Sequence, residues 1–347
     1  MKKRILISVS AILLLAVLFA LCSALVVPKY TDEKQLEGRL IGEYYQNAGG
    51  HDVIFIGDCE VYESFVPAVM WEKYGISSYI RGSSQQLAWH SYYILEETFK
   101  YESPKAVVFN VLALKYGETP REEISRMTLE DMAWSDSKWH AIRASMTEEE
   151  SLLSYFAPIL RYHGRWSELT LKDLTNTFDK HEDITHQGYL MQTDIVPVDP
   201  DDTREPEALI DSTLPLVSME YLKKMQALCE QYGAELVLIK APTNSVKYYW
   251  YDEWDAQIVE YAKANDLTYY NFVGMEEELG LDWSRDTYDA GLHLNVYGAE
   301  KLTVYLGKLL QDEHGVQSRQ SDAELDALWK QRIEQYETDK QKGENDS

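Results

Sequence analysis

Five short apolar segments, separated by stretches of helical periodicity, constrain the fold of this chain more than any other feature. They span residues 53–57, 78–81, 105–111, 234–241 and 267–272. The first, VIFIG, is apolar on both faces, as a central strand of a parallel sheet requires. Helical patterns between the segments indicate β-α-β units, and such units build parallel sheets through right-handed crossovers. The pattern therefore predicts a doubly wound, flavodoxin-like α/β fold.

One long interruption divides this pattern after the third strand, over residues 118–212. We interpret it as a mostly helical cap that is inserted into a domain covering residues 50–312. It ends in an irregular acidic segment, VDPDDTREPE. Loops at the carboxyl ends of parallel strands carry ligand sites, so we expect the cap to shape a substrate cleft. Helices are expected in the other connections, at 60–74, 86–101, 216–232, 253–265 and 296–310.

The N-terminus carries a long uncharged apolar run that extends from Ile5 to Val27. At about 1.5 Å per residue, a helix of this length spans a hydrocarbon core roughly 30 Å thick. The basic stretch MKKR before it predicts that this end stays in the cytoplasm and that the domain is extracellular. Residues 1–30 are thus expected to form a single-pass signal-anchor in the cell membrane. A signal peptide cleaved near the small residues at 22–24 is the alternative.

The composition excludes several classes of partner and site. The formal net charge is −25, and such a surface repels phosphate backbones, so no nucleic-acid partner is expected. Three cysteines cannot form a dense disulfide framework. A single bridge between Cys59 and Cys229 stays open, although Cys229 fits a core position on a predicted helix. The histidines outside the motif described below lack the tight spacing of metal ligands, so neither a metal nor another cofactor is expected.

The last segment, residues 313–347, is highly charged but has one apolar stripe. The stripe has helical spacing, and we expect it to dock on its own domain rather than on a partner. Residues 340–347 are expected to be disordered. The stripe consists of Leu325, Leu328, Trp329, Ile333 and Tyr336.

Two segments place reactive side chains at the carboxyl edge of the predicted sheet. The tripeptide GDC, which ends at Cys59, lies where the first strand turns into the first helix. A nucleophile there would lie close to helix N-terminal N–H groups, which stabilise negative charge. The second segment, residues 286–298, precedes the last helix and places Asp289 and His293 on one loop. The pattern indicates a nucleophile, an acid and a base at one edge.

Together these segments resemble the SGNH/GDSL hydrolase superfamily, over about residues 50–312. GDC at 57–59 matches the GDS block that opens the domain in that superfamily. Gly82, after the second strand, matches its oxyanion glycine. The sequence HLNVYG at 293–298 matches its C-terminal histidine block. The resemblance implies an SGNH hydrolase fold.

The match departs from the superfamily pattern in three places. Cys59 stands where serine is usual. Asp289 precedes His293 by four residues rather than three, so Asp286 is a second candidate for the orienting acid. The G-x-N-D block after the third strand is absent, and Asn110 is a rough stand-in for its oxyanion asparagine.

The resemblance implies a catalytic role for each matched residue. Cys59 would be the nucleophile, His293 the base that accepts its proton, and Asp289 the acid that fixes the imidazole tautomer. Backbone N–H groups of Cys59 and Gly82, with the amide of Asn110, would hold the oxyanion. We expect the imidazolium and the helix N-terminus to lower the pKa of the thiol.

Four charged residues are candidate substrate-binding groups, namely Asp58, Lys240, Arg161 and Arg165. Lys240 ends a predicted strand at the active edge. It would either meet an anionic substrate or form an ordinary structural ion pair.

The resemblance is closest to membrane-tethered members that handle acyl groups on surface polymers, such as the D-alanine-transfer proteins of lipoteichoic acid and proteins that work beside a multi-pass membrane O-acyltransferase. It implies an esterase or acyltransferase acting on a cell-wall or exported polysaccharide. A non-catalytic protein that binds a glycan or scaffolds a membrane O-acyltransferase is the alternative. A third hypothesis for the function is a thioesterase or a peptide-bond hydrolase.

Overall fold

The computed structural model describes residues 2–30, 33–178, 183–199, 201, 204–246 and 249–346. Within these residues the centre of the molecule is a five-stranded sheet, all parallel, in the order β2-β1-β3-β4-β5. This is the strand order of flavodoxin-like doubly wound sheets. Each strand lies within two residues of its predicted segment. The strands are β1 (Val53–Gly57), β2 (Ser78–Gly82), β3 (Ala106–Asn110), β4 (Glu235–Lys240) and β5 (Thr268–Asn271).

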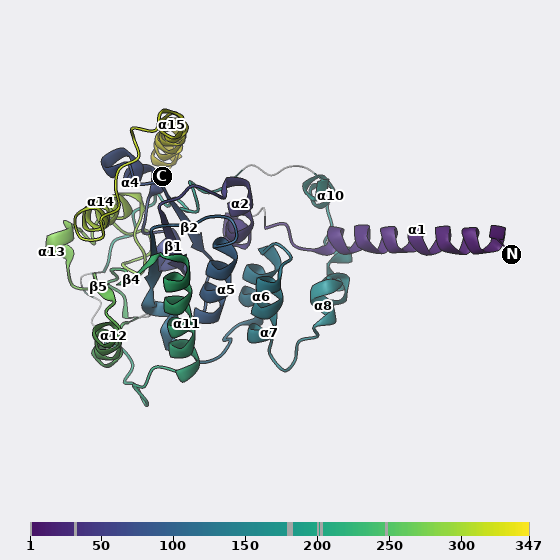
Figure 1. Ribbon diagram of the computed structural model, residues 1–347, viewed down its shortest axis with the longest axis horizontal. Helices are drawn as coiled ribbons and strands as arrows, with labels where there is room; N and C mark the ends of the chain where they lie inside the picture. The colour runs from purple at the N-terminus through teal and green to yellow at the C-terminus, as the bar shows by residue number, and fades with distance from the viewer. Residues whose placement is uncertain are drawn as a thin grey trace.

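Alternate residues of each strand pack into two separate cores, because successive side chains of a strand point to opposite faces. In β1, Ile54 and Ile56 belong to one core, and Val53 and Phe55 belong to the other. Helices cover both faces of the sheet (Figure 1). The first core includes side chains of α2 (Leu40–Asn47), α5 (Ala88–Thr98), α7 (Asp136–Ser145), α11 (Leu216–Tyr232) and α12 (Asp252–Ala264). The second includes α4 (Pro67–Tyr74), α13 (Glu276–Leu279), α14 (Val296–Asp312) and α15 (Ala323–Asp346).

The helix predicted over 60–74 is interrupted in the structure. A short helix, α3 (Cys59–Tyr62), ends before α4 begins at Pro67. Val66 is extended, with φ −114° and ψ 98°, because a residue that precedes proline is disfavoured in the helical region. The prediction of one continuous helix was therefore wrong. The break leaves Cys59 on a short turn of its own.

The insertion over 118–212 is helical only up to residue 178, about its first two-thirds. Beyond residue 178, the described residues of the insertion contain no helix. The 3₁₀ helices outside the insertion are η1 (Glu33–Arg39) and η2 (Val111–Lys115). Inside the insertion, besides α7, lie the α-helices α6 (Glu122–Asp131), α8 (Leu153–Phe156), α9 (Ile159–Tyr162) and α10 (Leu171–Phe178), and the 3₁₀ helix η3 (His163–Ser167).

The second half of the insertion follows the sheet domain rather than forming a separate cap. The N–H of Ile80 in β2 donates to the carbonyl of Gln187 at 3.0 Å, so this segment lies along the free edge of the sheet. Further along, Val196 donates to the carbonyl of Thr287 at 3.1 Å and accepts from Ala290 at 2.9 Å. The insertion therefore contacts the loop that carries Asp289 and His293 through its backbone.

The N-terminal helix α1 (Lys2–Val26) has 25 residues and is long and apolar enough to cross a membrane. It projects from the body of the molecule (Figure 1), and its large apolar side chains between Ile5 and Leu21 are exposed. Its C-terminal end contacts α9, η3 and α10. Which side of a membrane the domain occupies stays a prediction.

The charged C-terminal segment docks on its own domain, as its apolar stripe predicts. The indole ring of Trp329 stacks on that of Trp71 in α4, with ring centroids 5.4 Å apart. Tyr336 donates to a carboxylate oxygen of Glu300 in α14 at 2.6 Å. The helix continues to Asp346, so the predicted disorder from Lys340 was wrong for the described part of this segment.

We expect Trp329→Ala to lower the free energy of unfolding by about 3–5 kcal/mol, because it removes a fully buried indole and leaves a cavity beside Trp71. Leu328→Ala is the matched control, since that neighbouring side chain is 42% exposed. Chemical denaturation of the full chain in detergent measures both changes. Equal effects of the two substitutions would show that α15 does not dock through Trp329.

Candidate active site

The first half of the candidate site is the turn that follows β1. Asp58 caps α3, and its carboxylate accepts a hydrogen bond from the N–H of Glu60 at 3.2 Å. Cys59 is the first residue of that helix and is partly exposed. Gly57 has no room for a side chain, because a Cβ there would lie 2.4 Å from Cγ2 of Val61. The turn thus holds the thiol at the carboxyl edge of the sheet.

The second half is the loop before α14. Asn295 caps that helix by accepting from the N–H of Tyr297 at 3.1 Å, and its Nδ2 donates to the carbonyl of Arg285 at 2.7 Å. Its side chain therefore ties the start of the loop to its end. Gly291 has φ +88°, a conformation that side-chain-bearing residues rarely adopt. His293 lies just before this cap, so its backbone is fixed from both sides.

The two halves meet in a chain of hydrogen-bonded side chains. Sγ of Cys59 lies 3.0 Å from Nε2 of His293. Nδ1 of His293 lies 2.7 Å from Oδ2 of Asp289, and the backbone N–H of His293 donates to Oδ1 of Asp289 at 2.8 Å. Asp289 thus holds both the backbone and the ring of the histidine. Such geometry fits a nucleophile, a base and an acid that orients the base.

The structure distinguishes between the two candidate acids. Asp286 is fully buried and accepts from the N–H of Asp282 at 2.7 Å, and it also pairs with Lys301. Its carboxylate is thus engaged away from the histidine, whereas Asp289 binds the ring of His293 directly. Asp289 is therefore the acid in position to orient the imidazole, despite its unusual spacing.

A second carboxylate, Glu63, lies at the same histidine and was missed in the sequence. Its Oε2 is 3.6 Å from Nδ1 of His293, and its Oε1 accepts from the hydroxyl of Tyr288 at 2.9 Å. Burial raises the pKa of Glu63 to about 7. Glu63 follows Cys59 by four residues, and side chains at this spacing share one face of a helix. That spacing was the signal that could have found it.

The protonation of the pair differs from the sequence-based expectation. Burial raises the pKa of the Cys59 thiol to about 12, against the opposing influence of His293. Burial lowers the pKa of His293, but Cys59, Asp289 and Glu63 together raise it well above its ordinary value. His293 therefore acts in the predicted direction, but burial outweighs it and the net shift of the thiol pKa is upward. Because burial raises the thiol pKa, Cys59 would give its proton to His293 during attack rather than start as a preformed thiolate.

Lys240 lies beneath the site and does not reach a substrate. Its ammonium group is fully buried and binds both carboxylate oxygens of Glu60, at 3.0 and 2.8 Å, and the carbonyl of Ala241 at 2.8 Å. Of the two roles considered for it, the structural ion pair is the one that the geometry supports. The substrate-binding role is ruled out for Lys240 in this arrangement because no part of its side chain is exposed.

Asn110 belongs to the same buried cluster. Its amide nitrogen donates to Glu60 at 2.9 Å and to Asp58 at 3.3 Å, and its oxygen accepts from the N–H of Ala241. Both amide hydrogens are therefore used, so this arrangement leaves none for an oxyanion. Gly82 is paired in register with Gly57 at the same strand edge, and its oxyanion role stays a prediction.

The other candidate substrate-binding residues do not line the site. Asp58 is buried as the cap of α3. Arg161 binds Glu122 at 2.9 Å within the insertion. Arg165 binds Asp173 at 3.0 Å and the carbonyl of Val26 at the end of α1. Each of these side chains has a structural partner, and a substrate-binding role for the three stays a prediction.

No further thiol or metal cluster joins the site among the residues that the structure describes. Cys59 and Cys229 are both free, and Cys229 is buried in α11. The described His, Cys, Asp and Glu side chains contain no group of three that could hold a metal ion.

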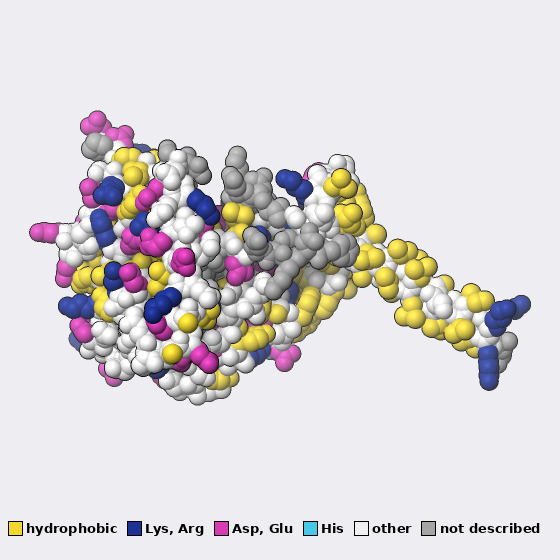
Figure 2. Space-filling model, turned by 90° about the horizontal axis from the view of Figure 1, so that it is seen from above, with side chains coloured by type: hydrophobic (Ala, Val, Ile, Leu, Met, Phe, Trp, Pro, Cys, Tyr) yellow, Lys and Arg dark blue, Asp and Glu magenta, His cyan; other side chains and the backbone are white. Residues whose placement is uncertain are grey.

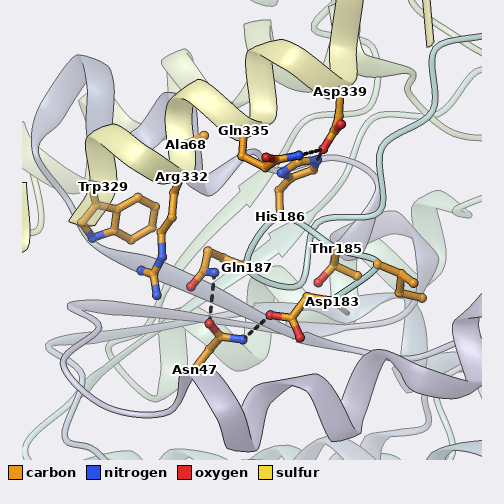
Figure 3. Close-up of a pocket in the computed structure, with 11 residues that line it drawn as sticks. Asn47, Ala68, Asp183, Thr185, His186, Gln187, Trp329, Arg332, Gln335 and Asp339 are labelled. Atoms are coloured by element: carbon orange, nitrogen blue, oxygen red, sulfur yellow. Dashed lines mark hydrogen bonds and ion pairs between the residues drawn. The ribbon is translucent and has the colours of Figure 1, made fainter. Parts of the chain in front are cut away.

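A polar cavity of about 500 Å³ lies elsewhere, between α15 and residues 183–187 of the insertion (Figure 3). Its lining includes neither Cys59 nor His293. Its polar side chains pair largely with one another, since Asn47 donates to Asp183 at 2.8 Å and accepts from Gln187 at 3.4 Å. We therefore place the candidate active site at Cys59 and not in this cavity.

No protein-family model matches this chain, and no curated protein matches it.

We expect the alkylation rate of Cys59 by iodoacetamide to rise continuously from pH 6 to pH 9, because burial raises the thiol pKa and the reactive thiolate fraction therefore grows with pH over this range. Subtracting the signal of Cys59→Ala isolates this thiol from Cys229. A rate that is already constant above pH 6 would indicate a preformed thiolate-imidazolium pair and contradict this interpretation.

We expect Glu63→Gln to shift this pH profile toward lower pH. Glu63 helps to raise the pKa of His293, so its neutral replacement makes the base form available at lower pH. Glu72→Gln, at an exposed side chain of α4 that pairs with Lys73, is the control and should leave the profile unchanged. An unshifted profile in Glu63→Gln would show that this carboxylate does not act on the histidine.

Proposed function

We propose that this protein is a membrane-anchored acyl hydrolase or acyltransferase of the SGNH/GDSL type, with Cys59, His293 and Asp289 as its catalytic residues. The observation that carries the proposal is the continuous contact from Sγ of Cys59 through the His293 ring to Asp289, at 3.0 and 2.7 Å. The flavodoxin-like strand order and the position of both segments at the carboxyl edge support an SGNH hydrolase fold.

In the first step, Sγ of Cys59 attacks the acyl carbonyl carbon while Nε2 of His293 takes the thiol proton. Asp289 stabilises the imidazolium that forms. The tetrahedral intermediate then collapses, the bond to the alcohol breaks, and His293 returns the proton to the leaving oxygen. The products of this half-reaction are a free alcohol and a Cys59 thioester.

In the second step, water or an acceptor hydroxyl gives its proton to His293 and attacks the thioester. Collapse of this intermediate releases an acid or a new ester and returns the proton to Cys59. The backbone N–H groups of Cys59 and Gly82 would hold the oxyanion in both steps, and one such donor is typically worth about 100- to 1,000-fold in rate.

The proposed substrate is an acylated cell-wall or exported polysaccharide outside the cell. The N-terminal helix supports a membrane location, and the net charge of −25 suits a neutral glycan better than a polyanion. A multi-pass membrane O-acyltransferase is the proposed partner that would supply or receive the acyl group.

One observation favours a second function, a non-catalytic protein that binds a glycan or scaffolds such an acyltransferase. The thiol pKa of about 12 means that Cys59 is not ionised at rest, which slows any attack that does not use His293 as base. The two functions differ in whether a covalent acyl-enzyme forms.

We expect the full chain, incubated with a p-nitrophenyl acyl ester, to form a thioester that mass spectrometry locates on the peptide containing Cys59. His293→Ala should reduce the rate by about 100- to 10,000-fold, as loss of a general base does. Cys59→Ala should form no adduct, and Cys229→Ala, at the buried free thiol, should behave as the unmodified chain. Equal rates in Cys59→Ala and the unmodified chain would end the catalytic proposal.

A further inference from the structure

We propose that the part of the insertion from α8 to α10 lies on the lipid surface as an interfacial pad beside α1. The proposal rests on α1 crossing the membrane, but it does not depend on any chemistry at Cys59. The pad is defined by six outward-facing apolar side chains: Leu153, Phe156, Leu160, Trp166, Leu171 and Leu174.

The exposure of these side chains is the first observation. Leu171 is 82% exposed, Leu153 66% and Phe156 56%. Single exposed apolar residues are ordinary, but a group of large ones over adjoining short helices marks an interaction surface. Hydrophobic side chains continue from α1 onto the adjoining part of the body (Figure 2). Trp134 stacks on Phe156 of the pad and is itself 55% exposed, so the exposed apolar surface continues onto that ring.

The position of the pad is the second observation. The helices α9 and α10, with η3 between them, contact the C-terminal end of α1, where Ser23 and Val26 are buried. Arg165 donates to the carbonyl of Val26 at 2.7 Å and so caps this end. In Figure 1, α8 and α10 lie beside the same end of α1. When α1 spans a bilayer, the pad therefore lies at the level where the chain leaves the hydrocarbon.

The orientation of α10 fits a helix lying in the membrane interface. Asp173 is turned toward the protein, where it accepts from Arg165 at 3.0 Å and from the N–H of Thr170 at 2.8 Å. Leu171 and Leu174 are turned outward instead. Trp166 adds an indole, a side chain that is enriched at the boundary between headgroups and acyl chains. Short helices with one apolar face bind membranes in this way.

Lipid is the occupant that this position favours. The pad adjoins the helix that is long enough to cross the bilayer, so lipid would surround it without any further association step. The pad would give the domain a second attachment besides the chain between α1 and α2. The height and tilt of the Cys59 edge above the membrane would then be fixed.

The test uses the full chain in phosphatidylcholine nanodiscs, with benzoylphenylalanine placed by suppression at one position in each variant. After irradiation, mass spectrometry identifies peptides that carry lipid. We expect lipid adducts at position 171, as at position 13 within α1. Position 216 is the matched control, because Leu216 is also the first residue of its helix and is 79% exposed, but lies on α11, away from α1.

Loss of lipid adducts at position 171, while those at position 13 persist, would overturn the pad and leave the anchor intact. Absence at both positions would overturn the pad together with the anchor. Equal lipid adducts at 171 and 216 would show unspecific labelling and would also overturn it. In cell membranes, adducts at 171 to a second protein without lipid would assign the surface to that protein instead. Repeating the labelling in Cys59→Ala separates this result from the proposed catalysis, because the adducts should not change.

Discussion

The buried ion pair between Lys240 and Glu60 is the interaction on which the rest of the candidate site depends. Lys240 ends β4, Glu60 follows Cys59, and Asn110 at the end of β3 donates to the same carboxylate at 2.9 Å. One carboxylate therefore joins the carboxyl ends of three neighbouring strands. Breaking a buried pair by removing one partner typically costs about 3–5 kcal/mol, because the other charge is left without compensation. The turn that presents the thiol is built on this cluster.

The sheet could be predicted from the sequence because its central strands are apolar on both faces and short. Helix ends and breaks were less accessible, although Pro67 did carry the signal that separates α3 from α4. The second half of the insertion could not be predicted, because residues such as Gln187 and Val196 place their backbone hydrogen bonds on partners far away in the chain. The local sequence does not indicate which distant residues will accept or donate these hydrogen bonds.

The candidate site shows the same division. The motif placed Cys59, His293 and Asp289 together, because all three lie at the carboxyl edge of the sheet. The motif could not assign the roles of Lys240 and Asn110, since these depend on which side chains the pairing of the strands places beside them. Helical spacing alone would have found Glu63. The direction of the thiol pKa depends on how deeply the turn is packed, which no tripeptide encodes.

The backbone pairing between the insertion and the histidine loop has a consequence for the modularity of this protein. Val196 exchanges hydrogen bonds with Thr287 and Ala290, and Asn295 donates its amide to the carbonyl of Asp194 at 3.0 Å. Deleting residues 118–212 as a unit would therefore remove backbone that holds the loop of His293, and would not merely uncover a cleft. The stretch around 190–198 lies within the insertion in sequence, but in the structure it is part of the sheet domain. Variation in length is better accommodated in the helical part of the insertion.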